Sequence, residues 1–280
     1  MKRLLDIEFH KFRYSKSSKV LTIIYLVIVV LLMLAGLIRL NFNNFSGGLS
    51  DLGIFNFPIV WHISTYFTSY LKIFIAIVIV SLTASEYSNR TLKQNLIDGL
   101  SKKELILSKV YLSALLALAV TIVVFVAALI LGIIYSDYNE IQIIVSDLYF
   151  FPVFFLSHFV LFCFCLFAGI LVKRSAFALG FLGVWWIVEG ILNLIARWCD
   201  WRFGLNSLEW LSHVLPFNAL SNLIKNPAGR IDLIQSTVNQ VDENLLDLSY
   251  SVDWQDVVSV TIWCFLFIYW SYLILKRRDL

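Results

Sequence analysis

Long apolar runs alternate with short polar segments along most of the chain. The runs lie at about 20–40, 59–82, 105–135, 150–172, 175–196 and 256–275. Each is long enough to cross a membrane, since a helix that spans the hydrocarbon core needs roughly 20 mostly apolar residues. Pro58 and Pro152 stand at the starts of two runs, where a missing N–H costs little. The pattern predicts an all-α, polytopic membrane protein, with six largely unbroken transmembrane helices over residues 20–280.

Composition and charge fit this class of protein. Hydrophobic residues make up 60% of the chain and charged residues 15%, and the mean hydropathy is +0.82. Lys and Arg collect at residues 2–19, 90–109, 173–174 and 276–278, and the loops at 41–58 and 136–149 contain none. Because basic residues stay on the inner side of a membrane, both termini are expected in the cytoplasm. Topology and lipid headgroups account for these residues, so no nucleic acid is expected as a partner. The expected location is the cell membrane, and in a bacterium the cytoplasmic (inner) membrane.

Residues 1–19 precede the first apolar run and predict a helix that lies on the membrane surface. Apolar side chains recur on one side of it, at Leu5, Phe9 and Phe12. Charged side chains occupy the other side, which is typical of an interfacial helix. The segment is either an elbow that touches a cytoplasmic partner or a basic anchor that orients the first span, and the sequence leaves both open.

A polar, basic segment separates the second and third runs. Leucines recur in it every four residues, at Leu92, Leu96 and Leu100. Gly99 provides a helix stop, and Ser101 with Glu104 fits a capping box that starts the next helix. We therefore expect a short surface helix at about 86–99, which is more structure than a simple connection between two spans requires.

The residues of this segment resemble those of ABC-2-type transporter permeases. The matching stretches are Ser85-Glu86-Tyr87, Arg90-Thr91-Leu92-Lys93-Gln94, Leu100-Ser101-Lys102-Lys103-Glu104-Leu105 and Ser108-Lys109. In that family a Glu-Tyr, a Gly-Thr-Leu-Lys and a Ser-Arg-x-Glu-Leu element follow the second span, although Asn89 stands here in place of the usual glycine. The resemblance implies a permease subunit with an N-terminal elbow helix and a coupling helix between the second and third spans.

The same resemblance implies partners and site residues. It implies a homo- or heterodimer of permease subunits bound to two ATP-binding subunits, and it favours export. The docking residues that it implies are Glu86, Tyr87, Arg90, Thr91, Leu92, Lys93, Leu96 and Leu100, with Leu5, Phe9 and Phe12 on the elbow. No phosphate-binding loop occurs in the sequence, so ATP and Mg are expected on the partner ATPase and no cofactor in this chain.

Catalytic and metal-binding patterns are not found. The sequence has no His-Glu-x-x-His or Gly-x-Ser-x-Gly element, and we do not expect an enzyme. Three cysteines lie within apolar runs and only Cys199 lies outside them, which predicts neither a metal site nor a disulfide.

Ionisable side chains inside membrane spans are costly and are candidates for function. Here they are Lys72, His158 and Glu189. Lys72 and Glu189 fall at comparable depths, so they either pair and lock two helices together, which we favour, or line a polar translocation path. His158 has no histidine or carboxylate near it in the sequence, which predicts a hydrogen-bonded structural histidine.

The segment at 197–255 is expected outside the cytoplasm, as short helices followed by an acidic loop. It could form a gate, bind an extracytoplasmic partner, or cover the outer opening of a dimer. The abundant aromatic residues, 16% of the chain, form either a membrane-interface belt or a cavity for an amphiphilic substrate.

Two other functions stay open: a permease-like subunit that does mechanical work on an outer partner, and a carrier or scaffold unrelated to ABC transporters. A carrier would usually have helices interrupted at mid-depth, and no Gly or Pro interruption is found.

Overall fold

Most of the chain forms helices long enough to cross a membrane. The computed structural model describes residues 2–42, 45–48, 53–89, 91–138, 140–204, 206–227 and 251–278. In this part, the single-helix spans are α2 (Lys16–Ala35), α6 (Lys102–Tyr135), α8 (Phe150–Val172), α9 (Ser175–Phe203) and α13 (Trp254–Arg277). The pair α3 (Ile59–Tyr70) and α4 (Lys72–Ser88) supplies a further span. The prediction of a helical, multi-pass membrane protein is confirmed.

The second span is bent, and the expectation that the helices would be unbroken is wrong here. α3 and α4 meet at Leu71 at an angle of 44°. Hydroxyl side chains in α3 donate to carbonyl oxygens of the preceding turn, from Ser64, Thr65 and Ser69. Such bonds compete with the backbone ladder and bend helices. The helix before this bend therefore contains hydroxyl residues that bond to its backbone, and it contains no proline within the span.

Short elements connect the spans. Strands β1 (Arg39–Phe42) and β2 (Phe45–Gly48) pair antiparallel, with Arg39 opposite Gly48, and are a small departure from the all-α prediction. Helix α7 (Ile141–Val145) lies between α6 and α8. Helices α10 (Ser207–Val214) and α11 (Pro216–Asn222) follow α9 and match the short helices expected there. The acidic loop of that segment falls largely outside the described residues.

Helix α8 is the centre of the fold. In its most apolar window, 72% of the residues are buried inside the chain. It packs against α4, α6, α9 and α13, and its aromatic residues Phe154, Phe162 and Phe164 are among the largest fully buried side chains. At its C-terminal end, the Arg278 guanidinium donates to the carbonyl oxygens of Ile170 and Leu171. Helix ends leave such carbonyls without partners, so the C-terminal residues close the end of the central helix.

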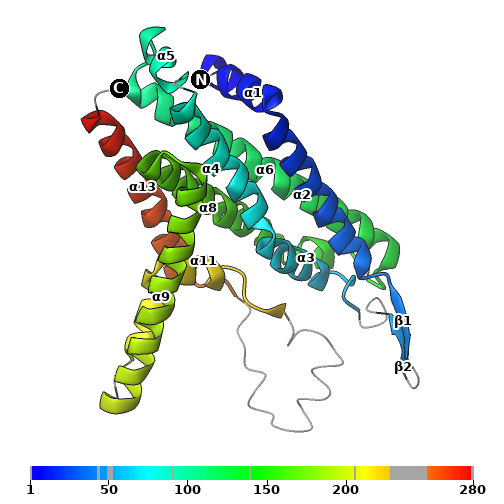
Figure 1. Cartoon of the computed structure of the whole chain (residues 1–280). Coiled ribbons are helices and arrows are strands. Elements are labelled where there is room, and N and C mark those ends of the chain that lie inside the picture. Colours follow the sequence, from blue (N-terminus) through cyan, green and yellow to red (C-terminus); the bar gives the residue numbers. More distant parts are fainter. Residues whose placement is uncertain are drawn as a thin grey trace.

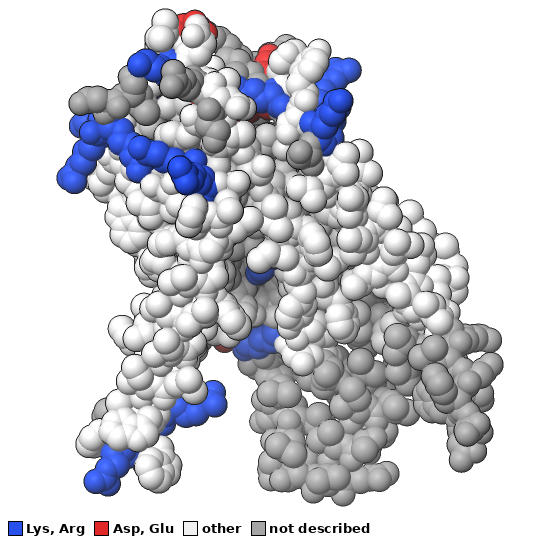
Figure 2. Space-filling model, viewed as in Figure 1, with Lys and Arg blue, Asp and Glu red and all other residues white. Residues whose placement is uncertain are grey.

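Both termini lie at the same end of the molecule (Figure 1). Helix α1 (Lys2–Tyr14) and helix α5 (Thr91–Ile97) lie at this end, whereas the β1–β2 hairpin lies at the other. Figure 2 shows that Lys and Arg side chains gather over the end that carries α1 and α5. The assignment of this end to the cytoplasm stays a prediction.

Candidate functional site

Helix α5 lies within the range predicted for the coupling helix, about 86–99, but it is shorter, because residues 86–88 continue α4. The face that it exposes also differs from the expected one. Leu92 is 1% exposed and Leu100 is buried. Leu92 belongs to the hydrophobic core, and Leu96 packs partly against that core. The exposed side chains of α5 are Thr91, Lys93, Gln94 and Ile97. Ile97 is 69% exposed. The leucines therefore hold α5 on its own chain, and Ile97 lies at the centre of its free face.

Both ends of this helix are fixed by local sequence. Gly99 has a left-handed backbone (φ 93°), and the Leu100 N–H donates to the Asn95 carbonyl oxygen at 3.0 Å. This is the geometry of a glycine helix stop. The predicted capping box of Ser101 and Glu104 is present at the start of α6. Arg90 lies outside the described residues, so its expected role in docking has no structural description.

A buried network of four charges lies where α4 ends, next to α5. Glu86 of α4 accepts from Lys109 of α6 (2.7 Å) and from Lys11 of α1 (3.0 Å). Glu8 of α1 completes the network, at 2.9 Å from Lys11 and 3.5 Å from Lys109. Ser108 also donates to Glu8. The network thus joins α1 to the ends of the two spans that flank α5.

Burial makes this network sensitive to the loss of any member. The side chains of Glu8 and Lys109 are 3% and 4% exposed. Burial by itself raises the pKa of Glu8, but Lys109 and Lys11 outweigh it and hold that pKa below its ordinary value. Removing one partner from a buried ion pair is strongly destabilising, because a charge is left uncompensated. The four groups therefore fix α1, α4 and α6 as one unit.

The face of α1 that packs on the spans contains a charged residue beside two of the predicted apolar ones. Leu5 and Phe12 are half-buried, but Phe9 is 52% exposed, and Glu8 takes its place on the inner face. Glu8 was missed because the prediction followed apolar side chains only. Its spacing from Leu5 and Phe12 is that of one helix face, so a search for charged residues on that face would have found it. Tyr87 is also half-buried, with the Arg278 guanidinium carbon 6.0 Å from its ring centroid.

The three ionisable residues predicted inside the spans have separate partners, so the favoured pairing of Lys72 with Glu189 is wrong. The Lys72 ammonium donates to the Ser157 hydroxyl at 3.1 Å. His158 Nδ1 lies 2.9 Å from the Phe154 carbonyl oxygen, one turn earlier in α8. Glu189 accepts instead from backbone N–H groups of α11 and from the Trp185 indole. Lys72 and Glu189 were predicted at similar depths in the membrane, but similar depth does not bring two side chains into contact.

Glu189 anchors α11 to α9. Its carboxylate accepts from the backbone N–H groups of Phe217 (3.0 Å) and Asn218 (3.2 Å), and from the Trp185 indole (2.7 Å). One turn further along α9, the amides of Asn193 and Asn218 donate to each other at 3.1 and 2.9 Å. The first N–H groups of a helix lack acceptors within the helix. The Glu189 carboxylate is the acceptor for two of these groups in α11.

A second polar contact holds α10 against the last span. His213 Nδ1 of α10 lies 2.7 Å from the carboxylate of Asp256, which is fully buried in α13. With Glu189, this contact fixes α10 and α11 to two different spans. Sequence analysis singled out neither His213 nor Asp256, since they are separated by 43 positions and carry no local pattern.

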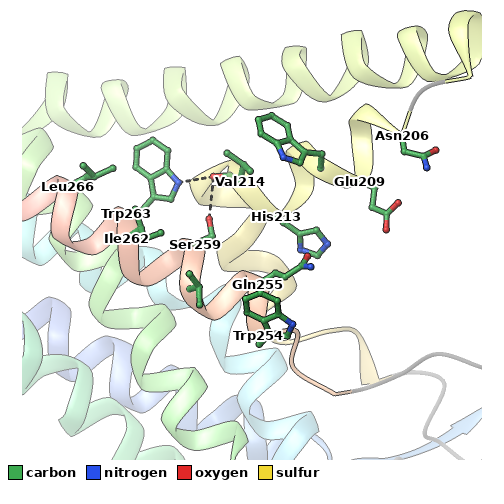
Figure 3. Close-up of a pocket in the computed structure, with 12 residues that line it drawn as sticks. Asn206, Glu209, His213, Val214, Trp254, Gln255, Ser259, Ile262, Trp263 and Leu266 are labelled. Carbon is green, nitrogen blue, oxygen red and sulfur yellow. Dashed lines mark hydrogen bonds between the residues drawn. The ribbon is translucent and has the colours of Figure 1, made fainter.

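An open pocket of about 710 Å³ lies between α10 and α13. Figure 3 shows the Trp263 indole and the Ser259 hydroxyl directed at the Val214 carbonyl, with distances of 2.7 and 3.4 Å. Two other indoles, of Trp210 and Trp254, also line it. Besides Ser259, its polar lining residues are Asn206, Glu209, His213 and Gln255. Aromatic walls with a few polar groups are typical of sites for small amphiphilic molecules.

A metal-binding cluster is not found in the part of the chain that the structure describes. There, no group of His, Cys, Asp and Glu side chains could hold a metal ion. The four cysteines are free thiols, and Cys163, Cys165 and Cys264 are buried. The arrangement of the described residues is that of a membrane subunit with a surface helix linked to its spans.

Comparison with known proteins identifies the family. None of the curated proteins compared with the chain matches it. The model of one family, described as ABC-2 family transporter protein, matches residues 3–280. The match includes α1, α5 and every span described above, and it agrees with the resemblance seen in the sequence around Glu86. The chain therefore belongs to the ABC-2 family of transporter proteins.

Proposed function

We propose that this chain is the permease subunit of an ATP-driven exporter, and that a separate ATP-binding subunit docks on the exposed face of α5. The observation that carries the proposal is the two-sided nature of α5. Its leucines are buried or half-buried in its own chain, whereas Lys93, Gln94 and Ile97 are exposed. An exposed apolar side chain with polar neighbours is a common centre of a protein contact. ATP and Mg would be bound by the partner.

The structure offers a route from this docking face to the spans. Helix α5 is connected to the broken second span at one end and to α6 at the other. The Glu86–Lys109 contact joins these two spans directly below it, and Glu8 and Lys11 attach α1 to the same point. Because these contacts are buried, a displacement of α5 is expected to move α1, α4 and α6 together. A dimer of permease subunits, bound to two ATPase subunits, would use this motion to open a path between its halves.

The test is co-purification of the partner from the native membrane. The tagged chain is solubilised in detergent, and the proteins that accompany it are identified by mass spectrometry. Ile97→Glu should remove an ATP-binding-cassette subunit and leave the permease folded, because Ile97 is 69% exposed. Ile141→Glu is the matched control, since Ile141 is 77% exposed and belongs to α7, far from α5. Recovery of no ATP-binding subunit with the wild-type chain would refute the proposal.

A mechanical role on an outer partner is the second candidate. It is favoured by the two polar contacts that fix α10 and α11 to the spans, at Glu189 and at Asp256. Motion of α9 or α13 would be delivered through them to the outer segment. An extracytoplasmic protein that co-purifies with wild type, and is lost with a change in α10 that keeps the ATPase bound, would favour this role over export.

A further inference from the structure

The pocket between α10 and α13 is amphipathic along its length. Figure 3 shows most of its polar side chains gathered at one end and apolar side chains at the other. The polar end is formed by Asn206, Glu209, His213 and Gln255, and Ile262 and Leu266 line the apolar end. Because α13 begins at Trp254, the polar end lies where this span ends, and the apolar end lies deeper in the span. The shape of the pocket therefore suits a molecule with a polar head at the membrane surface and a hydrocarbon tail.

The side chains of the polar end are accessible to a ligand. Trp210 and Trp254 are 65% and 71% exposed, and Glu209 is exposed. The His213 side chain is 25% exposed, although its partner Asp256 is buried. A volume of about 710 Å³ is within the usual range for sites of small molecules. A headgroup can thus enter the pocket without any rearrangement of the chain.

The charge of this pocket favours a cation. Its lining residues include one carboxylate, Glu209, and neither Lys nor Arg. Among the described residues, no cationic side chain forms an ion pair with Glu209. His213 adds no net positive charge, because its Nδ1 lies 2.7 Å from the Asp256 carboxylate, which would neutralise an imidazolium. The negative charge of Glu209 is therefore available to a ligand.

Aromatic rings add a second attraction for a cation. The pocket is lined by three indoles, those of Trp210, Trp254 and Trp263. The face of an indole ring attracts cations, and aromatic cages are a known means of binding quaternary ammonium groups. The Trp263 N–H already donates to the Val214 carbonyl oxygen at 2.7 Å, so this indole has no donor left for an anion. Rings and carboxylate thus select the same sign of charge.

The apolar end continues into a second cavity. Ile262 and Leu266 also line an open cavity of about 650 Å³ between α6 and α13, together with Leu107 and Phe265. A hydrocarbon tail that enters the first pocket can therefore extend along α13. Lys103 lines the second cavity as well, and its positive charge would repel a cationic head. The two cavities together favour one orientation, with the head at the polar end of the first pocket.

We propose that the pocket between α10 and α13 binds an amphiphile with a single cationic headgroup, a quaternary or protonated ammonium on a hydrocarbon chain. Glu209 and the ring faces of Trp210 and Trp254 contact the cation, and Ile262 and Leu266 contact the chain. That this amphiphile is a transported substrate rests on the proposed function, whereas its binding does not. Exposed tryptophans also form membrane-interface belts, but a belt has no saturable site that selects charge.

The test measures equilibrium binding of radiolabelled tetradecyltrimethylammonium to the full chain, purified alone and immobilised in a constant concentration of neutral detergent. Unlabelled tetradecylammonium, tetradecylphosphocholine and tetradecyl sulfate have the same chain and compete for the saturable part of this binding. Tetradecylammonium should compete better than the phosphocholine compound, whose phosphate would lie near Glu209, and tetradecyl sulfate should not compete. The order of the two ammonium compounds shows whether the preferred head is quaternary or a protonated amine.

Variants assign the binding to the pocket. The double change Trp210→Leu and Trp254→Leu should weaken binding of tetradecyltrimethylammonium by about tenfold, the combined effect of two cation–π contacts. Glu209→Gln should weaken it by about threefold, and Glu209→Lys should bind radiolabelled tetradecyl sulfate, which wild type does not. The controls are Trp201→Leu, at an 81% exposed position of α9, and Glu140→Gln, at an exposed position before α7. Neither residue lines the pocket, so both variants should bind as wild type does.

Three results would overturn the proposal. The first is no saturable binding to wild type, and the second is equal affinity for all four amphiphiles, which would show an apolar groove without charge selection. The third is unchanged affinity in both Glu209→Gln and the double tryptophan variant. Because no ATPase is present in this experiment, each result leaves the co-purification test of the proposed function unaffected. Absence of an ATPase with intact, charge-selective binding would, conversely, refute the transporter proposal and keep the binding site.

Discussion

At the scale of single residues, the buried charges of this protein differ in what compensates them. Glu8, Glu86, Lys11 and Lys109 neutralise one another, and Glu189 is compensated by backbone N–H groups. Lys72 has only a hydroxyl. Substitutions should therefore have opposite consequences: loss of a network member strands a charge, whereas loss of the Lys72 charge strands none.

Lys109→Met should lower the free energy of unfolding by about 3 kcal/mol, because Glu8 and Glu86 would then share the partly exposed Lys11. Denaturant titration of the purified chain measures this loss. Lys103→Met is the control on the same helix, since Lys103 is exposed, and it should change stability by no more than about 0.5 kcal/mol. Equal effects of the two substitutions would show that the network contributes nothing beyond an ordinary surface lysine.

Glu189→Gln should loosen the attachment of α11 to α9. Glutamine has one acceptor oxygen where Glu189 uses two, and its amide would face the N–H groups of Phe217 and Asn218. The expected cost is about 1–3 kcal/mol, seen as faster protease cleavage between α9 and α11. Glu209→Gln, at an exposed position of α10, should leave cleavage unchanged. Protection equal to that of wild type in Glu189→Gln would contradict the anchoring role.

At the scale of elements, attachment of α1 should depend on acidity. Lysines hold the pKa of Glu8 below its ordinary value, so its contribution to stability is complete above about pH 4.3 and is lost as pH falls through the lowered pKa. Glu86, Ser108 and both lysines of the network face this carboxylate. The stability difference between wild type and Glu8→Gln should stay constant from neutral pH down to that value and then shrink. A difference that shrinks already near neutral pH would contradict this pairing.

The elements also show where sequence reasoning succeeds. Apolar runs located the spans, and Gly99 with the Ser101–Glu104 box fixed the end of α5 and the start of α6, because these signals depend on neighbouring residues alone. The spacing of the leucines predicted α5. It does not show whether the leucine face packs on its own chain or binds a partner, so Ile97 was missed. The break at Leu71 was missed because only Gly and Pro were searched, and hydroxyl side chains such as Ser64 accompany it. The partners of Glu189 depend on how distant segments meet.

At the scale of the whole molecule, α9 is the span least covered by its own chain. Only 17% of its most apolar window is buried, and Figure 1 shows that one end of it extends away from the other spans. Large side chains such as Trp186, Ile187 and Leu194 are more than half exposed. A side chain added at Gly183 or Gly190 would meet no atom within 4 Å, and small residues let membrane helices approach closely. This face suits a second permease subunit.

Gly183→Cys should accordingly give covalent dimers in native membranes when a short thiol cross-linker is added, in a background where the four native cysteines are replaced. The reason is that α9 helices of two subunits would bring the new thiols together. Val126→Cys on α6 is the control, because Val126 is 43% exposed on the surface of a different span. A product of twice the 32.2 kDa chain mass indicates a homodimer, and a product of another mass indicates a different permease partner. If Gly183→Cys yields no product, or no more than Val126→Cys, then α9 faces lipid and the subunits meet elsewhere.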